Sequence, residues 1–564
     1  MMRAKHVGAY GKRAALCWIV LSVGAHLAAA TGGGPALLDA VKHGNHAAIR
    51  TLLQQVDANV AEPDGTTALH LAVLHDDAGS VELLLGAGAN VQAANRYGVT
   101  PLMIASTNGN ASIIERLLDA GADPDTTTSE GETVLMTAAR TGNVDAVRAL
   151  LARSATVDAT EQWRGQTALM WAAAENHAST VKALLDAGAD LKVRSNGGFT
   201  ALLFAVRSGA RDAVNVLLDA GADVNDAIDA PPRRGSAMTS SAPAPAAPAR
   251  STQSGAAALG ARANAGSNDP SVDRLLQAFN TGSRATRGDG PNGTSALVLA
   301  ITNAHFELAG LLLDRGADPN AGRQGWSPLH QIAWTRKYPI QHGLPPPVPT
   351  GNLSSLELAR KLLEHGANVD ARMTKEPADG ARNVLDRIGS TPFLQASKLA
   401  DVPYMRVLLE HGADPSIATE EGATALMAAA GVGIWQVGES AGTNEEAFEA
   451  VKLCYDVGND VNAIDQNGDT ALHGAAHRGA NDIVKFLVEK GAKLNVVDKL
   501  GWTPWIIADG VFYPNTYNRR LDTAELLLKL GADPKIGKRR PEDLAPSDEL
   551  QHKAPASKSR QQQH

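Results

Sequence analysis

Cysteine and aromatic residues are scarce in this chain of 564 residues. The sequence contains two cysteines, and phenylalanine, tryptophan and tyrosine together make up 4% of it. Cys17 belongs to the segment 1–30, so without that segment only Cys454 remains and no internal disulfide can form. So few aromatic side chains favour thin layers of helices, packed through small residues, over one bulky core.

Sequence motifs of catalysis are absent as well. The chain has no phosphate-binding loop and no G-x-S-x-G, H-E-x-x-H or C-x-x-C pattern. His70, His330 and His473 recur at one position of a repeated sequence, and no pair of histidines has the spacing of a metal site. The acidic residues recur with the same repeat, which indicates architecture rather than a paired acid and base. We therefore expect no catalytic residue, no cofactor and no bound metal.

An excess of basic residues is also missing. The formal net charge is −8, and removing residues 1–30, which contain four basic and no acidic residues, makes it −12. Proteins that bind nucleic acids usually present a basic surface. The charge balance therefore argues against a nucleic-acid partner.

One apolar run stands out, near the N-terminus. It extends from Ala14 to Leu27, follows four basic residues and precedes Ala28-Ala29-Ala30, which has the small-residue pattern of a cleavage site. The run is shorter than the roughly 20 residues that a membrane span needs. We interpret residues 1–30 as a cleaved signal peptide and expect a periplasmic or secreted protein without an integral membrane span. An uncleaved N-terminal anchor is the alternative.

A sequence pattern recurs about eleven times along the rest of the chain. Its clearest copy reads G-T-T-A-L-H-L-A-V from Gly65, followed by V-E-L-L-L-G-A-G-A-N from Val81. The next copies restart at an almost constant interval, at Gly98, Gly131, Gly165 and Gly198. A second series has two longer intervals, after its second and fourth members, and starts at Gly293, Gly325, Gly389, Gly422, Gly468 and Gly501.

The pattern resembles the ankyrin repeat. Its Thr or Ser suits the N-cap of a first helix, and a proline such as Pro101 suits the first helical position. The glycine after the second helix suits a left-handed backbone. A period of about 33 with the T-x-L-H signature is typical of that family. The resemblance implies an all-α solenoid of stacked helix–turn–helix units with β-hairpin fingers, and it implies protein binding without naming the partner.

The spacing of the copies predicts two arrays joined by a flexible linker. Ala, Pro and Ser dominate the break between the arrays, and such a composition disfavours a packed core. The predicted regions are a signal peptide at 1–30, an N-terminal array of a capping repeat plus five repeats at 35–227, and a linker at 228–291 in which 271–280 can form a short helix. They continue with a C-terminal array of six repeats with insertions at 292–536 and a disordered tail at 537–564.

Residues that depart from the repeat mark the candidate binding surface. The resemblance implies binding through the fingertips and the exposed face of the first helix of each unit, and Trp, Tyr and Arg dominate interface energies. Insertions after Trp334, Gly431 and Asp509 fall at the same helix joint, so we expect their aromatic residues to form a rim. Packing of each tryptophan over a neighbouring finger is the alternative. The predicted protein-binding residues are Arg96, Tyr97, Trp163, Arg164, Arg323, Trp326, Trp334, Tyr338, Trp435, Trp502, Phe512 and Tyr513.

Together these features predict a non-catalytic scaffold for protein–protein interactions that acts outside the cytoplasm. The leader and the alanine-rich composition indicate a bacterial member of the family. Two alternatives are an accessory subunit of a periplasmic or secreted enzyme complex and a secreted effector that acts on a host. An enzyme or a carbohydrate-binding module is a further alternative, which the missing motifs disfavour.

Overall fold

The computed structural model describes residues 33–230, 292–337, 346–377, 385–434, 442–512 and 517–539. These residues fall into two compact units, 1–104 and 105–564, here named the N-terminal unit and the C-terminal unit. The boundary lies within α5 (Pro101–Asn108). The predicted signal peptide, the helix at 271–280 and nearly all of the predicted tail lie outside the described residues.

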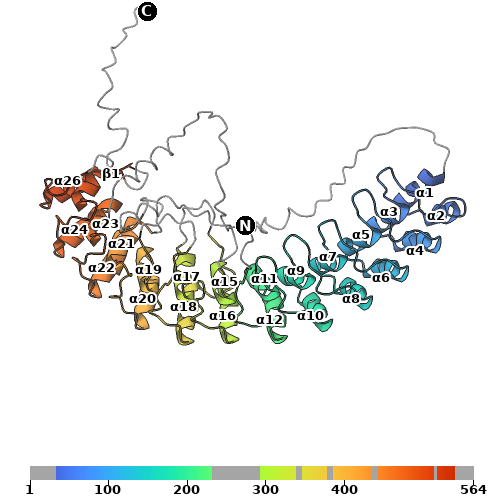
Figure 1. Ribbon diagram of the computed structural model, residues 1–564, viewed down its shortest axis with the longest axis horizontal. Helices are drawn as coiled ribbons and strands as arrows, with labels where there is room; N and C mark the ends of the chain where they lie inside the picture. Colours follow the sequence, from blue (N-terminus) through green and yellow to red (C-terminus); the bar gives the residue numbers. More distant parts are fainter. Residues whose placement is uncertain are drawn as a thin grey trace, which may run out of the picture. The chain divides into compact units, whose positions relative to one another are not determined.

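The N-terminal unit consists of helix pairs that stack in chain order (Figure 1). The first pair, α1 (Gly33–Lys42) and α2 (His46–Leu52), packs on α3 (Ala68–Leu74) and α4 (Ala78–Gly86). Leu37 of α1 and Leu69 of α3 are fully buried. The first pair lacks the T-x-L start, as expected of a repeat that caps the end of a stack.

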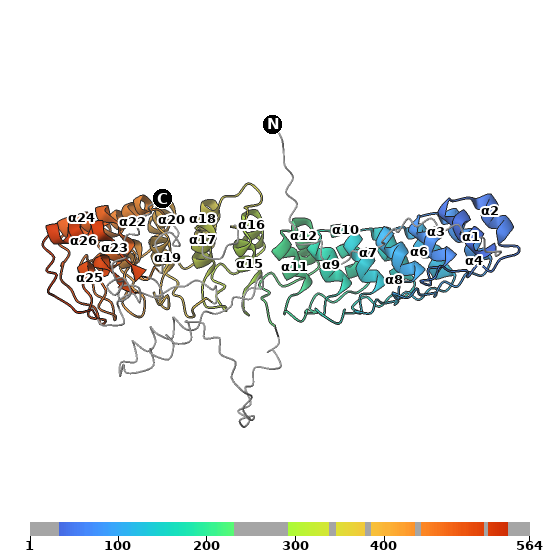
Figure 2. The same cartoon turned by 90° about the horizontal axis from the view of Figure 1, so that it is seen from above.

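The C-terminal unit consists of helix pairs of the same kind (Figure 2). The first helix of each pair packs against the first helix of the next pair, as α7 does on α9, and second helices contact second helices. None of the described helices is long and apolar enough to cross a membrane. The helices are α6 (Ala111–Asp119), α7 (Val134–Thr141), α8 (Val144–Ala152), α9 (Ala168–Ala174), α10 (Ala178–Asp186), α11 (Ala201–Ser208), α12 (Arg211–Asp219), α15 (Ala296–Thr302), α16 (Phe306–Asp314), α17 (Pro328–Arg336), α18 (Ser355–Glu364), α19 (Pro392–Lys398), α20 (Val402–Glu410), α21 (Ala425–Ala430), α22 (Asn444–Asp456), α23 (Ala471–Arg478), α24 (Asn481–Glu489), α25 (Pro504–Asp509) and α26 (Leu521–Lys529).

The predicted caps begin and end these helices. In α7, the Thr133 hydroxyl accepts a hydrogen bond of 3.1 Å from the backbone N–H of Met136, an N-cap that contributes about 1 kcal/mol. The helix ends at Gly142, whose φ of 76° is a left-handed conformation that a side chain would strain. The all-α ankyrin solenoid predicted from the sequence is therefore confirmed.

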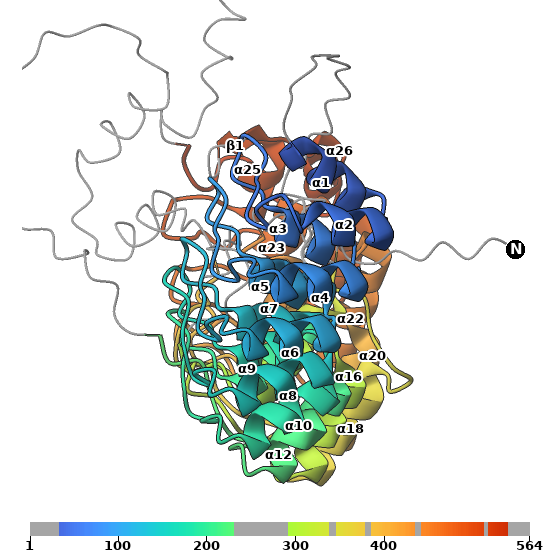
Figure 3. The same ribbon diagram turned by 90° about the vertical axis from the view of Figure 1, so that its right-hand side faces the viewer.

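The fingers between the repeats are mainly turns rather than β-hairpins, and in the C-terminal unit they project on one side of the helices (Figure 3). Among the described residues they contain isolated bridges such as that between Thr127 and Thr133. Neighbouring fingers are joined by backbone hydrogen bonds, as from Gln162 N–H to the Glu130 carbonyl at 3.0 Å. The short strands β1 (Val511–Phe512) and β2 (Tyr517–Asn518) form an antiparallel pair, but at the joint between α25 and α26.

Stacking continues across the predicted linker. Helix α11 packs on α15, and the Ile228 N–H donates to the Thr294 carbonyl at 2.9 Å. Arg315 also binds Asp219 at 2.8 Å. Residues 231–291 therefore separate α11 from α15 in the sequence, but these two helices pack directly on each other. The residues that flank this segment, Ala230 and Asn292, are hydrogen-bonded to each other.

Candidate functional site

Two fingertips present exposed aromatic side chains beside arginine. Tyr97 of the N-terminal unit is 64% exposed, and the Arg96 guanidinium lies 4.7 Å from its ring centroid. Trp163 of the C-terminal unit is 73% exposed, and the Arg164 guanidinium lies 5.0 Å from its ring. Arginine stacked on an exposed aromatic ring is a common anchor of protein interfaces.

The Trp163 fingertip is held in place by its backbone. The N–H of Arg164 donates to the Glu161 carboxylate at 2.8 Å, and the Asn196 side chain of the next finger donates to the Trp163 carbonyl at 2.9 Å. The two side chains therefore project from a fixed turn. Arg323, another predicted residue, is likewise exposed on its finger.

Trp326 and Trp502 are buried, which corrects the expectation that they are exposed anchors. They are 7% and 3% exposed, and the Trp326 indole N–H donates to Gln331 Oε1 at 3.1 Å. The position of each tryptophan relative to its repeat glycine explains the difference in exposure. Trp163 precedes its repeat glycine by two positions and lies at the tip, whereas Trp326 and Trp502 directly follow theirs and turn into the stack. Phe199, at the same register, is also buried.

Only part of the predicted aromatic rim lies within the described residues. Trp334 is half-buried, its ring lies 5.5 Å from that of Trp326, and its N–H donates to Gln395 Oε1 at 3.2 Å. The predicted residues Tyr338, Trp435 and Tyr513 lie outside the described residues, and so does the side chain of Phe512. The rim therefore stays a prediction.

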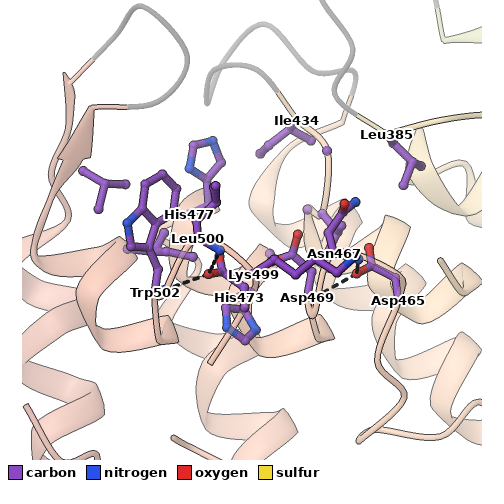
Figure 4. Close-up of a pocket in the computed structure, with 17 residues that line it drawn as sticks. Leu385, Ile434, Asp465, Asn467, Asp469, His473, His477, Lys499, Leu500 and Trp502 are labelled. Atoms are coloured by element: carbon purple, nitrogen blue, oxygen red, sulfur yellow. Dashed lines mark hydrogen bonds between the residues drawn. The ribbon is translucent and has the colours of Figure 1, made fainter. Parts of the chain in front are cut away.

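A cavity of about 70 Å³ lies where α21, α23 and the finger after α24 meet (Figure 4). Figure 4 shows Trp502 and His477 on one side of this cavity and Ile434 and Leu385 on the other. Its polar lining includes three carboxylates, those of Asp465, Asp469 and Asp498, together with His473 and Lys499. We name Asp469, His473 and Asp498 the DHD cluster, because one ligand atom of each lies within 4.8 Å of the others.

Two of the carboxylates hold the turns of adjacent fingers. Asp465 Oδ1 accepts from the N–H of Asn467 at 2.8 Å and of Asp469 at 2.9 Å. Asp498 Oδ1 accepts from the N–H of Leu500 at 2.9 Å and of Trp502 at 2.7 Å. These hydrogen bonds favour the charged form of Asp465 and Asp498, but they do not offset the free-energy cost of burying the charge.

Burial dominates the electrostatics of the three carboxylates. Burial, with the charge of Asp469 as the next cause, raises the pKa of Asp465 and that of Asp498 to about 7. Burial alone raises the pKa of Asp469 to about 6. Within the described part of the chain, none of the three forms an ion pair with lysine or arginine. These three carboxyl groups therefore lose their protons close to neutral pH and not near pH 4.

His473 differs from the histidines at the same repeat position. His70 Nε2 lies 2.9 Å from the Val99 carbonyl, and His330 Nε2 lies 3.0 Å from the Ser390 carbonyl, so both rings connect adjacent repeats. His473 is 1% exposed, and its Nε2 has no hydrogen-bond partner among the described residues. In all three rings Nδ1 accepts from the backbone N–H of the N-cap residue.

Several groups act on the His473 ring without bonding to Nε2. Burial lowers the pKa of His473, whereas the charge of Asp498 and then the backbone of Trp502 and Val496 raise it. The two backbone groups act on the ring electrostatically, but neither forms a hydrogen bond of ordinary geometry with Nε2. The ring is therefore buried next to a carboxylate with one nitrogen unused by the described residues.

Sequence reasoning assigned His473 a structural role and did not single out the cavity. The bond to Thr470 supports that role, but the neighbouring carboxylates were missed. A signal was available in the residue that follows each repeat glycine. Only the copy from Gly468 combines an acidic residue there, Asp469, with histidine in the T-x-L-H position.

Comparisons with known proteins agree with this architecture. A family described as ankyrin repeats (3 copies) matches residues 7–95, 26–128, 74–161, 102–195, 135–228 and 440–538, and a single ankyrin repeat matches 292–322. The chain is 34% identical over 214 residues to ankyrin repeat and SOCS box protein 16 of Homo sapiens, covering 38% of this chain and 39% of that protein. It is 40% identical over 72 residues to serine/threonine-protein kinase 12 of Arabidopsis thaliana, covering 13% of this chain and 15% of that protein.

The chain therefore spans well under half the length of these two relatives. Among solved structures, the human ASB11 ankyrin repeat domain is 27% identical with a TM-score of 0.31, covering 34% of this chain and 85% of that chain. The family matches more than half of the residues, and within the described residues the matched stretches contain helix pairs of the structure. The chain belongs to the ankyrin-repeat family.

Proposed function

We propose that this protein is a non-catalytic scaffold that binds a protein partner outside the cytoplasm. The observation that carries the proposal is the Trp163–Arg164 fingertip, a 73% exposed indole stacked with a guanidinium on a fixed turn. An exposed tryptophan has an apolar area that a partner can bury, and the arginine adds directed hydrogen bonds. The Tyr97–Arg96 pair offers the same chemistry on the N-terminal unit.

The location outside the cytoplasm is supported by the sequence of residues 1–30. A basic start, a short apolar run and Ala28-Ala29-Ala30 have the order of a secretory signal. Mass spectrometry of the N-terminus of the protein recovered from its native cells tests this part. A chain that begins after Ala30 supports export with cleavage, and a chain that retains residues 1–30 in the cytoplasm contradicts it.

The binding proposal is tested with a fingertip variant, Trp163→Ala with Arg164→Ala. The full chain, immobilised, is used to recover partners from the native extracytoplasmic fraction. We expect the variant to lose roughly 30-fold or more in affinity for the partner, which corresponds to a hot spot of about 2 kcal/mol. Stoichiometric recovery of one enzyme would favour the accessory-subunit role.

A matched control lies on the outer face of α10. Lys182→Ala removes an exposed side chain of α10 that pairs with Asp186 of the same helix at 3.1 Å. This variant should bind the partner like the native chain. Equal binding by the fingertip variant, with its fold intact by circular dichroism, would place the interface elsewhere.

A further inference from the structure

The DHD cluster places three potential metal ligands from two adjacent repeats together. Asp469 directly precedes Thr470, the N-cap of α23, and His473 lies in the first turn of that helix. Asp498 comes from the finger that follows α24. One ligand atom of each residue lies within 4.8 Å of the other two, and His473 and Asp498 are buried. A ligand bound there would connect two repeat units.

Each member of the cluster has bonding capacity that the described residues do not use. The Asp469 carboxylate accepts no hydrogen bond from a described residue, and burial is the one cause of its raised pKa. Asp498 uses Oδ1 for its two turn bonds, which leaves Oδ2 available. His473 Nε2 is enclosed and has no partner in the described part of the chain. Burying polar groups without partners costs free energy, unless a bound ligand supplies the missing interactions.

The charges of the cluster favour a cation as that ligand. A ligand atom of Asp469 lies within 4.8 Å of one of Asp498, so the two carboxylates repel each other when both are charged. The lining also contains Lys499, whose backbone N–H bonds to the Asn467 carbonyl at 2.8 Å, but no described lysine or arginine forms an ion pair with either carboxylate. A divalent cation would offset both charges and reverse the electrostatic penalty.

We propose that the DHD cluster binds one divalent transition-metal ion of the Zn²⁺ class. One imidazole nitrogen and two carboxylate oxygens are ligands that Zn²⁺ accepts, whereas Mg²⁺ and Ca²⁺ prefer oxygen alone. Three protein ligands leave a fourth position for water or a group from a partner. This inference is independent of the fingertip interface.

Closing around the ion requires a small movement. Zn²⁺ holds its ligands at about 2.0–2.2 Å, so the ligand atoms must approach to roughly 3.3 Å from one another. Asp469 can turn without breaking a hydrogen bond, because its carboxylate makes none with described residues. Asp498 can contribute Oδ2 while Oδ1 keeps its turn.

The ring of His473 has a suitable second contact. Thr470 Oγ1 lies 2.8 Å from His473 Nδ1. Coordination through Nε2 needs a proton on Nδ1, which would then donate to Thr470 Oγ1, as metal-bound histidines usually donate to an oxygen. In return the Thr470 N–H, now 3.0 Å from Nδ1, loses its acceptor. Thr470 is therefore a positioning residue.

Zn²⁺ titration of the tag-free full chain, stripped with a chelator and followed by calorimetry, tests the site. We expect one high-affinity equivalent per chain and a higher unfolding midpoint with Zn²⁺. Asp469→Asn should lower the affinity more than about tenfold and abolish the rise in midpoint. Thr470→Val should keep the stoichiometry and lower the affinity by roughly tenfold.

Glu132→Gln is the matched control, because Glu132 follows the glycine of its own repeat while Met136 occupies the histidine position. It should bind Zn²⁺ like the native chain. His473→Gln should lose the site, and Asp469→Asn keeps the test decisive if that variant fails to fold. Absence of binding by the native chain, or equal affinity in the native chain and Asp469→Asn, would overturn the proposal.

Discussion

The repeats from Gly131 to Asp219 and those from Gly325 to Asp509 have the same helix pairs but different interiors. In the regular region, adjacent repeats are joined by turn residues, as where Asp158 accepts from the Asp190 N–H at 3.1 Å. In the interrupted region, charged side chains enter the stack. Arg336 binds Asp401 through bonds of 2.6 and 2.9 Å, and the Asp401 side chain is 1% exposed.

This difference indicates which parts of a repeat protein can bury charged side chains. In the repeats of constant length the first-helix caps recur, since the hydroxyls of Thr133, Thr167 and Thr200 each accept from the backbone N–H three residues on. In the other region insertions interrupt the repeat. Arg336 lies close in sequence to one insertion, and Ile434 and Val511, which line the cavity, lie close in sequence to the other two.

The largest expected effect comes from breaking the buried pair. Arg336→Met leaves the Asp401 carboxylate buried beside an apolar side chain, so we expect the stability of this region to fall by about 3–5 kcal/mol. Urea unfolding followed by tryptophan fluorescence measures it. In the regular region, Arg148→Met removes an exposed pair with Asp145 and should cost under about 0.5 kcal/mol. If both variants lost the same unfolding free energy, the two regions would not differ in the contribution of their ion pairs.

The second effect is a pH dependence at His330. Burial lowers the pKa of His330 to about 4, and the unfolded chain binds the proton near its ordinary 6.5. Stability should therefore decrease as the pH falls from 6.5 to 4 and then level off, by about 3 kcal/mol in total.

His330→Gln isolates this contribution. The difference in unfolding free energy between the native chain and the variant should shrink over that pH range, since glutamine does not titrate. A difference that stays constant from pH 7 to pH 4 would show that His330 does not carry the effect.

The smallest expected effect is at the fingertip. Trp163→Ala removes a 73% exposed ring and should change the unfolding free energy by less than about 0.5 kcal/mol. Trp326→Ala, in the interrupted region, empties a buried site and should cost about 3–5 kcal/mol. Thermal unfolding compares the two. A large loss of stability with Trp163→Ala would mean that the indole supports the finger instead of facing solvent.

Much of the fold could be predicted because it depends on local chemistry. Thr133 as an N-cap and Gly142 as a left-handed helix end need only their neighbours in sequence. The position of a tryptophan depends on register instead. Trp326 and Trp163 both lie near a repeat glycine, but Trp326 follows its glycine and turns into the stack, whereas Trp163 precedes its glycine and faces solvent.

The acidic cavity could not be predicted from single repeats. Asp469 and His473 belong to one copy and Asp498 to the next, so the cluster exists only once two copies are stacked. Each residue has an ordinary role in its own repeat, as Asp498 does in its turn. Comparing all copies position by position reveals the coincidence, but not the burial that gives it its electrostatics.

Helix α11 packs on α15, so the stack of repeats is continuous at a place where the repeat sequence is interrupted. Residues 230 and 292 lie side by side, with the Asn292 side chain donating to the Ala230 carbonyl and accepting from its N–H, both at 3.0 Å. The two described ends that flank residues 231–291 therefore meet at one finger. We expect a protease cut between residues 231 and 291 to yield two polypeptides that stay associated through the packing of α11 on α15. The stack therefore depends on helix packing on both sides of the break and not on an unbroken chain through it.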